Sequence, residues 1–259
     1  MYDQSSFLIV ALLFISLMLA IEMSCYIGRK AQTHLSDAAR AQINAIQASL
    51  LGVLALLLGF TFSQSLQRFD ARSEAVVDEA NAIGTAHLRA QLLPASVRED
   101  VQGLLVEYLN LRIQASTVSM DMQNQREALL EKATQRQTAL WHLARKAAAD
   151  DNSPGTTGLF IQSLNELIDS YGRRDAAIVR HVPEPVIILL FCAFILTGVV
   201  VGYSSGAEGH RVSMATYILV LLIALLVFII IDLDRPRRGL IEVQQESLIG
   251  LQHAIRAER

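Results

Sequence analysis

The sequence predicts an all-α membrane protein with four transmembrane helices and a helical cytoplasmic region built on a long continuation of the second helix. The 259 residues are 52% hydrophobic and only 18% charged. The mean hydropathy of +0.36 is too high for an ordinary soluble domain of this size. Between the apolar stretches, hydrophobic residues recur at helical spacing with little strict alternation, which favours helices over strands.

Four apolar stretches are long enough, or nearly so, to cross a hydrocarbon core that requires about 20 helical residues. The first has no basic leader and no small-residue cleavage site, so we expect it to be retained and not removed as a signal peptide. The predicted spans are residues 7–27, 46–63, 186–203 and 214–231. The predicted domains are a first membrane hairpin (1–63), a helical cytoplasmic domain (64–183), a second membrane hairpin (184–232) and a cytoplasmic amphipathic tail (233–259).

Basic residues next to the spans set the expected orientation. With four crossings, both termini and the long 64–185 region lie on the same side of the membrane. That side carries more arginines close to the spans than the other side does, so the positive-inside rule places it in the cytoplasm. We therefore expect a multi-pass protein whose termini and large helical domain are cytoplasmic.

The overall charge and the cysteines exclude several kinds of partner. The formal net charge of -3 provides no basic field for nucleic acid. Cys25 and Cys192 lie in apolar runs and lack the Cys and His spacing of a metal site or a redox motif. The lipid bilayer is thus the expected surroundings, and we expect no cofactor and no metal.

An uninterrupted helical pattern runs from Asn44 to Leu93, through the second span and far beyond it. At about 1.5 Å per residue this helix would be roughly 75 Å long, whereas the hydrocarbon core takes only about 30 Å. An isolated amphipathic helix gains its stability from packing and not from propensity. The projecting half must therefore pack against other helices.

Small residues recur along this helix at spacings that let helix backbones approach closely. Ser49, Gly52, Gly59 and Ser63 follow an a/d spacing, with Leu56 between them. One interpretation is tight packing inside one subunit. The other is that the helix lines the central axis of a homo-oligomer, where small residues leave space and an occasional phenylalanine narrows it. The spacing alone leaves both interpretations open.

Glu22 is an ionisable residue about three quarters of the way along the first span. Such a residue inside a membrane is a candidate for an ion pathway or a gate. The alternative is an interfacial carboxylate, because Glu22 lies only seven residues before Arg29 and can reach toward the membrane surface.

Charged residues follow the second span on the same predicted helix. Arg68 and Arg72 lie one turn apart among acidic residues, a pattern typical of a solvated helix face. The functional alternative is a ring of guanidinium groups below the pore that attracts anions. Further along lie Glu79, Asn81, His87 and Arg89. There we expect an interhelical hydrogen-bond network, with His87 as a candidate pH sensor.

The stretch DLDRPRRG, residues 232–239, ends the fourth span. We expect its acidic residues at the water boundary and its arginines near lipid headgroups or, alternatively, in contacts that bridge subunits. The residues concerned are Asp232, Asp234, Arg235, Arg237 and Arg238. The tail that follows predicts a short amphipathic helix, which either lies on the membrane or straps a neighbouring subunit.

The sequence contains no motif that indicates an enzyme. Nucleophile-elbow, zinc-protease, P-loop and dinucleotide-binding patterns are absent, and the six histidines are scattered. We therefore expect a protein without catalytic residues.

Several longer stretches carry a more specific signal. They are LLGFTFSQSLQRFDAR (57–72), VVDEANAIGTAHLRAQLLP (76–94), LNELID (164–169) followed by two arginines, VPEP (182–185) and IIDLDRPRRGLIEVQQESL (230–248). Together they resemble the bacterial bestrophin-like domain family, and the resemblance covers residues 46–251. It implies a protein of the bacterial inner (plasma) membrane.

Bestrophins proper are oligomeric channels, mostly for anions, and are typically pentamers whose second membrane helix lines a hydrophobic neck. By that resemblance Leu56 and Phe60 would form the constriction, with Gly52 and Ser63 beside them in the pore. The chain lacks a recognisable acidic calcium clasp near the fourth span and a proline motif before the neck helix. Calcium gating is therefore not implied.

Two functions are compatible with these patterns. The resemblance implies a homo-oligomeric channel that passes small ions, anions favoured, through an axial pore lined by the second membrane helix. The alternative is a non-conducting membrane scaffold or signalling protein whose helical cytoplasmic domain binds a partner.

Overall fold

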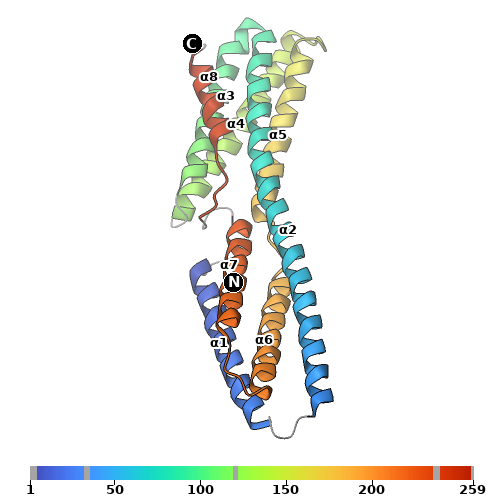
Figure 1. The fold of residues 1–259 in the computed structure, drawn as a ribbon. Coiled ribbons are helices and arrows are strands. Elements are labelled where there is room, and N and C mark those ends of the chain that lie inside the picture. Colours follow the sequence, from blue (N-terminus) through green and yellow to red (C-terminus); the bar gives the residue numbers. More distant parts are fainter. Residues whose placement is uncertain (1–4, 32–35, 119–121, 236–239, 258–259) are drawn as a thin grey trace. The chain divides into compact units, whose positions relative to one another are not determined.

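The structure is a computed structural model that describes residues 5–31, 36–118, 122–235 and 240–257. In these residues every regular element is helical (Figure 1), which confirms the predicted all-α fold. The elements in chain order are α1 (Ser6–Ala31), α2 (Asp37–Arg89), the 3-10 helix η2 (Ala90–Leu92), α3 (Ala95–Thr117), α4 (Gln123–Asp150), α5 (Thr157–Val179), α6 (Glu184–Ala207), α7 (Met214–Asp234) and α8 (Glu246–Ala257).

Four helical segments are long and apolar enough to cross a membrane, as the sequence predicts. They are Ser6–Ala31, Asp37–Leu92, Thr157–Ala207, which includes α6, and Met214–Asp234. In the second segment only 11% of the most apolar stretch is buried inside the subunit, against 28% to 33% in the other three. The α2 span thus has the least cover from its own chain.

The chain forms two compact units, and α2 contributes residues to both. Unit 1 comprises Met1–Phe69 and His181–Glu242, and unit 2 comprises Asp70–Arg180 and Val243–Arg259. Unit 1 contains α1, α6, α7 and the first part of α2. Unit 2 contains the remainder of α2 together with α3, α4, α5 and α8.

A close crossing of α1 and α6 holds unit 1 together. Gly198, Gly202 and Gly206 recur at every fourth position of α6, and a methyl group on any of them would overlap atoms of α1. At Gly202 the overlap would be with the Ser24 hydroxyl and the Ile21 carbonyl oxygen. Small residues at this spacing let membrane helices touch backbone to backbone, which gives dispersion contacts that lipid cannot replace.

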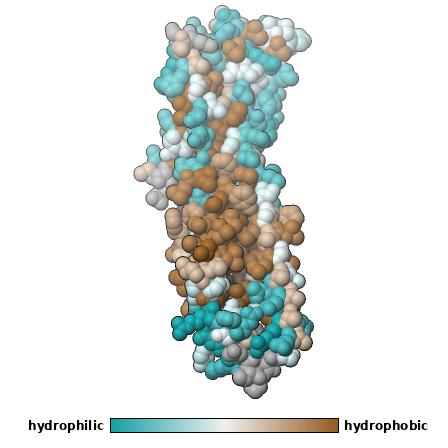
Figure 2. Space-filling model, in the orientation of Figure 1, coloured by the Kyte–Doolittle hydropathy of each residue, from teal (hydrophilic) through white to brown (hydrophobic). Residues whose placement is uncertain are grey.

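The interior of unit 1 is apolar, and Leu54 is buried there at 3% exposure. It packs in one cluster with residues of α1, α6 and α7, namely Ile9, Leu13, Leu190, Phe194, Ile223, Val227 and Ile231. Large apolar side chains also cover the outside of these helices, among them Phe7, Leu12, Leu196 and Leu225. Figure 2 shows this apolar surface in brown over the span helices, as expected for faces that contact lipid.

Unit 2 is a helical bundle with one continuous apolar core. Val76, Ala80, Ile83 and Ala86 of α2 point into it at spacings of three and four residues, the pattern of an amphipathic helix. The largest buried residues supplied by α3, α4 and α5 are Leu105, Tyr108, Leu109, Leu140, Phe160, Leu164 and Leu167. The predicted packing of the continued second helix against other helices is therefore confirmed.

The last helix packs on its own subunit. In α8, Leu248 is fully buried and Ile255 is 5% exposed, and both belong to the core of unit 2. Leu251 lies against Gly84 of α2. The predicted amphipathic helix is present, and the buried residues of its apolar face are covered by α2 and α3.

Short connections join the helices of unit 2. α4 ends at Asp150 and α5 begins at Thr157. At the start of α3, which begins at Ala95, the Ser96 hydroxyl donates to Asp150 Oδ2 at 3.1 Å and so joins α3 to the end of α4. Residues 119–121, between α3 and α4, lie outside the described residues.

Candidate functional site

The predicted constriction residues lie on a face of α2 that the subunit leaves uncovered. Leu56 and Phe60 are 58% and 60% exposed, and Gly52 and Ser63 are exposed as well. A methyl group on Gly52 or Gly59 would meet no atom within 4 Å. Packing of these glycines inside one subunit, the first of the two interpretations, is therefore not observed in the described part of the chain.

Contacts on the other side of α2 fix which face stays open. Near the start of the helix, Asn44 accepts a hydrogen bond from the Ser204 hydroxyl at 2.7 Å. Its amide nitrogen donates to Glu208 Oε1 at 3.1 Å. Further along, Leu54 is inserted among α1, α6 and α7. These contacts turn the face with Leu56 and Phe60 away from the subunit.

Arg68 and Arg72, which the sequence offers as a ring of guanidinium groups below the pore, make contacts within their own chain. Arg72 is 2% exposed, and its guanidinium donates to the carbonyl oxygens of Ala177 (3.1 Å) and Arg180 (2.6 Å). These carbonyls end α5, where the helix dipole is negative and a cation is stabilising. Arg68 is partly exposed, and its Nε lies 4.0 Å from Asp234 Oδ1.

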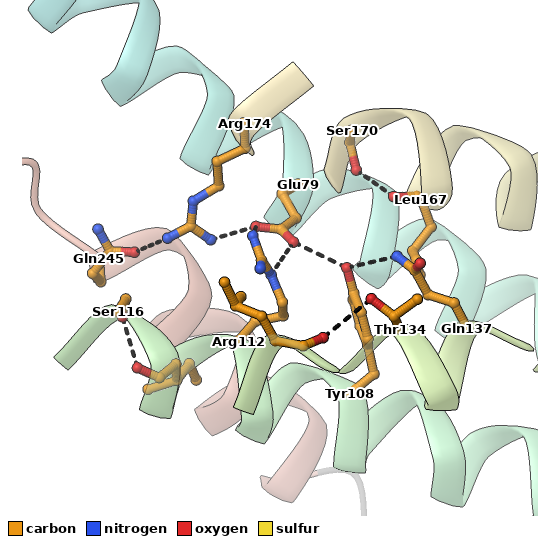
Figure 3. Close-up of polar contacts among 12 residues, drawn as sticks. Glu79, Tyr108, Arg112, Ser116, Thr134, Gln137, Leu167, Ser170, Arg174 and Gln245 are labelled. Atoms are coloured by element: carbon orange, nitrogen blue, oxygen red, sulfur yellow. Dashed lines mark hydrogen bonds and ion pairs between the residues drawn. The ribbon is translucent and has the colours of Figure 1, made fainter. Parts of the chain in front are cut away.

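Glu79 lies in a buried charged network inside unit 2 (Figure 3). Its carboxylate accepts hydrogen bonds from Arg112 Nε at 2.6 Å, Arg112 Nη2 at 3.2 Å and the Tyr108 hydroxyl at 3.1 Å. It also pairs with Arg174. Arg174 in turn donates to Gln245 Oε1 at 2.6 Å, so one network joins α2, α3, α5 and the segment before α8.

The charges of this network are unequal, since one carboxylate faces two guanidinium groups. Burial alone would raise the pKa of Glu79, but the charges and hydrogen bonds of Arg112 and Arg174 outweigh it and hold the pKa below its usual value. Burial and the negative charge of Glu79 raise the pKa of Tyr108. Tyr108 therefore stays protonated and donates to the carboxylate.

The remaining residues of the predicted network on α2 differ in their contacts. Arg89 donates from Nη1 to the Leu159 carbonyl oxygen of α5 at 3.0 Å, and His87 is 6% exposed. The expectation of interhelical hydrogen bonds is confirmed for Glu79 and Arg89. The role of His87 as a pH sensor stays a prediction.

The two aspartates at the end of α7 bind backbone N–H groups of the same chain. Asp232 Oδ2 accepts from the N–H groups of Leu240 (2.8 Å) and Ile241 (2.9 Å). Asp234 accepts from the Val182 N–H at 3.0 and 3.1 Å, just before α6 begins. Arg235 donates to the Ser6 hydroxyl at 3.1 Å. Arg237 and Arg238 lie outside the described residues.

Glu22 hydrogen-bonds to a residue of another span. The Tyr217 hydroxyl donates to Glu22 Oε1 at 2.5 Å in a bond open to the surface of the subunit, where Glu22 is exposed and Tyr217 is half-buried. Tyr217 belongs to the first turn of α7, which begins at Met214 after the Ser213 cap. The carboxylate therefore lies at the depth of a helix end and not at the middle of a span, which favours the interfacial interpretation.

The sequence does not predict which residues complete the network of Glu79. Tyr108, Arg112 and Arg174 bind its carboxylate directly. Gln137 donates to Tyr108, and Gln245 accepts from Arg174. A signal for Arg112 was present, because it continues the apolar stripe formed by Val101, Leu105, Tyr108 and Leu109 on α3. A charged residue on a buried stripe indicates an opposite charge inside the fold, although the stripe does not identify the partner.

The described residues contain no group of three or more His, Cys, Asp or Glu side chains that could hold a metal ion. The fold and this arrangement of side chains define the chain as an all-helical, multi-pass membrane protein with a charged helical bundle. The sequence profile of the bestrophin-like domain matches residues 15–248. The chain therefore belongs to the bestrophin-like family.

Two solved structures of a bacterial bestrophin homologue have a similar fold. One variant of a bacterial bestrophin homologue from Klebsiella pneumoniae matches with a TM-score of 0.65 at 17% identity, covering 93% of this chain and 96% of that one. A second variant matches with a TM-score of 0.59 at 16% identity, covering 92% and 98%. At these identities the likeness establishes the fold alone. No curated protein matches the sequence.

Proposed function

We propose that this chain assembles into a homo-oligomeric ion channel of the bacterial inner membrane, with the α2 helices around an axial pore. The observation that carries the proposal is the uncovered face of α2, on which Leu56 and Phe60 are more than half exposed. A methyl group on either neighbouring glycine of that face, Gly52 or Gly59, would meet no atom of the described residues within 4 Å. Copies arranged around an axis would enclose this face, and the family resemblance implies five copies.

The chemistry of the uncovered face fits a narrow apolar neck. Leu56 and Phe60 lie one helical turn apart, so each subunit would contribute two adjacent apolar rings. Rings of this kind control ion passage by excluding water from a short stretch of pore. Gly52 and Ser63 lie a turn before and a turn after this pair, where small residues leave a wider, wetter path.

The orientation of the channel follows from the basic residues beside the spans. Arginines concentrate on the side that carries both termini and the helical bundle, which the positive-inside rule places in the cytoplasm. Ions leaving the neck toward that side would pass along the continued part of α2. The unbroken helix from Asp37 to Arg89 is then explained as the wall of both pore and vestibule.

The neck is tested by shortening one of its side chains. Phe60→Ala should increase ion flux from proteoliposomes that contain the purified oligomer, because it removes the larger of the two apolar rings. The matched control is Leu196→Ala, since Leu196 is 61% exposed on α6 and lies off the proposed pore. Unchanged flux for both variants in an oligomer of verified mass would contradict the neck. A protein that conducts no ion in any variant would favour the membrane scaffold.

A further inference from the structure

A polar cleft of about 410 Å³ lies between α2 and α5 within unit 2. Its floor contains Ala82 and Ser163, which are 6% and 3% exposed. Because both side chains are small, the two helices leave a space that larger residues would fill. Charged and polar side chains of both helices surround this floor, namely Asp78, Asn81, Thr85, Arg89, Gln162, Glu166 and Arg173.

One end of the cleft carries a positioned guanidinium group. The hydrogen bond from Arg89 Nη1 to the Leu159 carbonyl oxygen, 3.0 Å long, holds the group in place. In the part of the chain that the structure describes, no carboxylate pairs with Arg89. The side chains of Thr85 and Gln162, which line the cleft beside it, also make no hydrogen bond among the described residues. This end therefore offers donors suited to a carboxylate.

The other end of the cleft carries more negative than positive charge. Arg173 pairs with Glu166 and also interacts electrostatically with Asp78 and Asp169. Asp78 and Glu166 both line the cleft, so two carboxylates face one guanidinium group there. The cleft as a whole is close to neutral, but its two ends have opposite charge.

We propose that this cleft binds a small zwitterion whose carboxylate pairs with Arg89 and whose ammonium group lies between Asp78 and Glu166. Asp78 and Arg89 are 11 residues apart on α2, which corresponds to about 16 Å between their Cα atoms. Leu159, which holds Arg89, and Glu166 are seven residues apart on α5, or about 10 Å. The carboxylate and the ammonium group of the ligand must therefore lie at opposite ends of a chain of several bonds, as in an ω-amino carboxylate. This site lies beyond the proposed channel function and does not depend on conduction.

The charge requirement is tested with three probes of equal length on the purified full-length protein. Isothermal titration calorimetry should detect binding of 6-aminohexanoate. Binding of 6-hydroxyhexanoate, which lacks the ammonium group, and of 6-aminohexanol, which lacks the carboxylate, should each be about tenfold weaker or undetectable. The proposal is overturned by no binding of 6-aminohexanoate, or by equal binding of all three probes.

Substitutions test which residues bind the carboxylate and the ammonium group of the ligand. Arg89→Gln should weaken binding of 6-aminohexanoate about tenfold. The matched control is Arg98→Gln, because Arg98 also donates to a backbone carbonyl, that of Leu93, but lies outside the cleft. Asp78→Asn should weaken binding similarly, whereas Asp100→Asn, at an exposed position of α3, should have no effect.

A steric variant keeps the test independent of folding effects. Thr85 is exposed in the cleft, so Thr85→Trp should leave the fold intact and block the site. Each variant is accepted only when its thermal unfolding matches that of the unmodified protein. Retained binding in a folded Thr85→Trp or Arg89→Gln protein would place the ligand elsewhere and overturn the proposal.

Discussion

The carboxylate of Glu79 is completely buried. Its contacts determine how much the free energy of unfolding would fall if the charge were removed by substitution. The side chain is 0% exposed and compensates two arginines that are themselves about 5% exposed. Replacing one member of a buried ion cluster leaves the remaining charges without compensation, which typically costs about 3 to 5 kcal/mol. Glu79→Gln should therefore lower the thermal unfolding temperature of the purified protein markedly.

The matched control for this prediction is Glu74→Gln. Glu74 is exposed on the same helix, so its substitution should change stability by less than about 0.5 kcal/mol. Equal losses in the two variants would show that the network around Glu79 contributes nothing beyond an ordinary surface charge.

The lowered pKa of Glu79 gives a second, pH-dependent prediction. A carboxyl group whose pKa is lower in the folded than in the unfolded state contributes stability that is fully present above the unfolded value, about 4.3 for Glu. That contribution is lost as the pH falls through the folded pKa. The gap in unfolding temperature between the unmodified protein and Glu79→Gln should thus be constant from about pH 8 to about pH 5 and narrow below about pH 4. A gap that widens in acid would contradict the direction of the shift.

Among the elements, the pair α1 and α6 makes the most specific contact in unit 1. Because a methyl group on Gly202 would overlap the Ser24 hydroxyl and the Ile21 carbonyl, Gly202→Ala should force the helices apart at a cost of about 1 to 3 kcal/mol. Gly172→Ala on α5 is the control, since nothing lies within 4 Å of that position. There alanine should be neutral or stabilise the helix by up to about 1 kcal/mol. Unfolding temperatures measured in detergent compare the two, and equal effects would argue against the close crossing.

The elements also show how far the sequence predicts this structure. Length and apolar composition located all four spans, and the unbroken periodicity from Asn44 to Leu93 predicted a helix that the structure places at Asp37–Arg89 followed by η2. Periodicity identifies the buried stripe of a helix but not the helix that covers it. The pairing of Glu79 with Arg174, 95 positions away, and of α1 with α6 is therefore absent from any local pattern.

The small residues of α2 and α6 illustrate the same limit. Both helices carry glycines at spacings that permit close packing, and local sequence does not distinguish them. In the structure, Gly198, Gly202 and Gly206 lie against α1, whereas a methyl group on Gly52 or Gly59 would meet no atom of the described residues within 4 Å. Glycines at packing-compatible spacings thus make a contact within the chain in one helix and lie on an uncovered surface in the other.

For the whole molecule, the sign of the charge along the proposed conduction path decides which ions it favours. The family resemblance implies a preference for anions, and a ring of guanidinium groups at Arg68 and Arg72 was the one feature of α2 predicted to attract them. Arg72 is buried with its guanidinium on α5 carbonyls, and Arg68 faces Asp234. The exposed charged residues that follow on α2 are instead acidic, Asp70 and Glu74 among them.

Helix geometry relates these carboxylates to the neck. Asp70 follows Gly52, and Glu74 follows Leu56, by 18 residues each, which is about five complete turns. By this spacing, both residues would share one face of an ideal helix with the residues of the proposed constriction. In an oligomer each would form a ring of negative charge, and such rings attract cations and repel anions at close range.

The resulting prediction is a cation-directed reversal potential. In a planar bilayer with a KCl gradient, the unmodified channel should reverse at a voltage with the sign expected for K⁺, and the double variant Asp70→Asn, Glu74→Gln should move that voltage toward zero. Glu131→Gln, at an exposed position of α4, is the control and should leave it unchanged. A reversal potential of the sign expected for Cl⁻ that the double variant does not move would refute the acidic rings while leaving the axial pore intact. The charge that selects the ion would then have to come from groups other than the exposed carboxylates of α2.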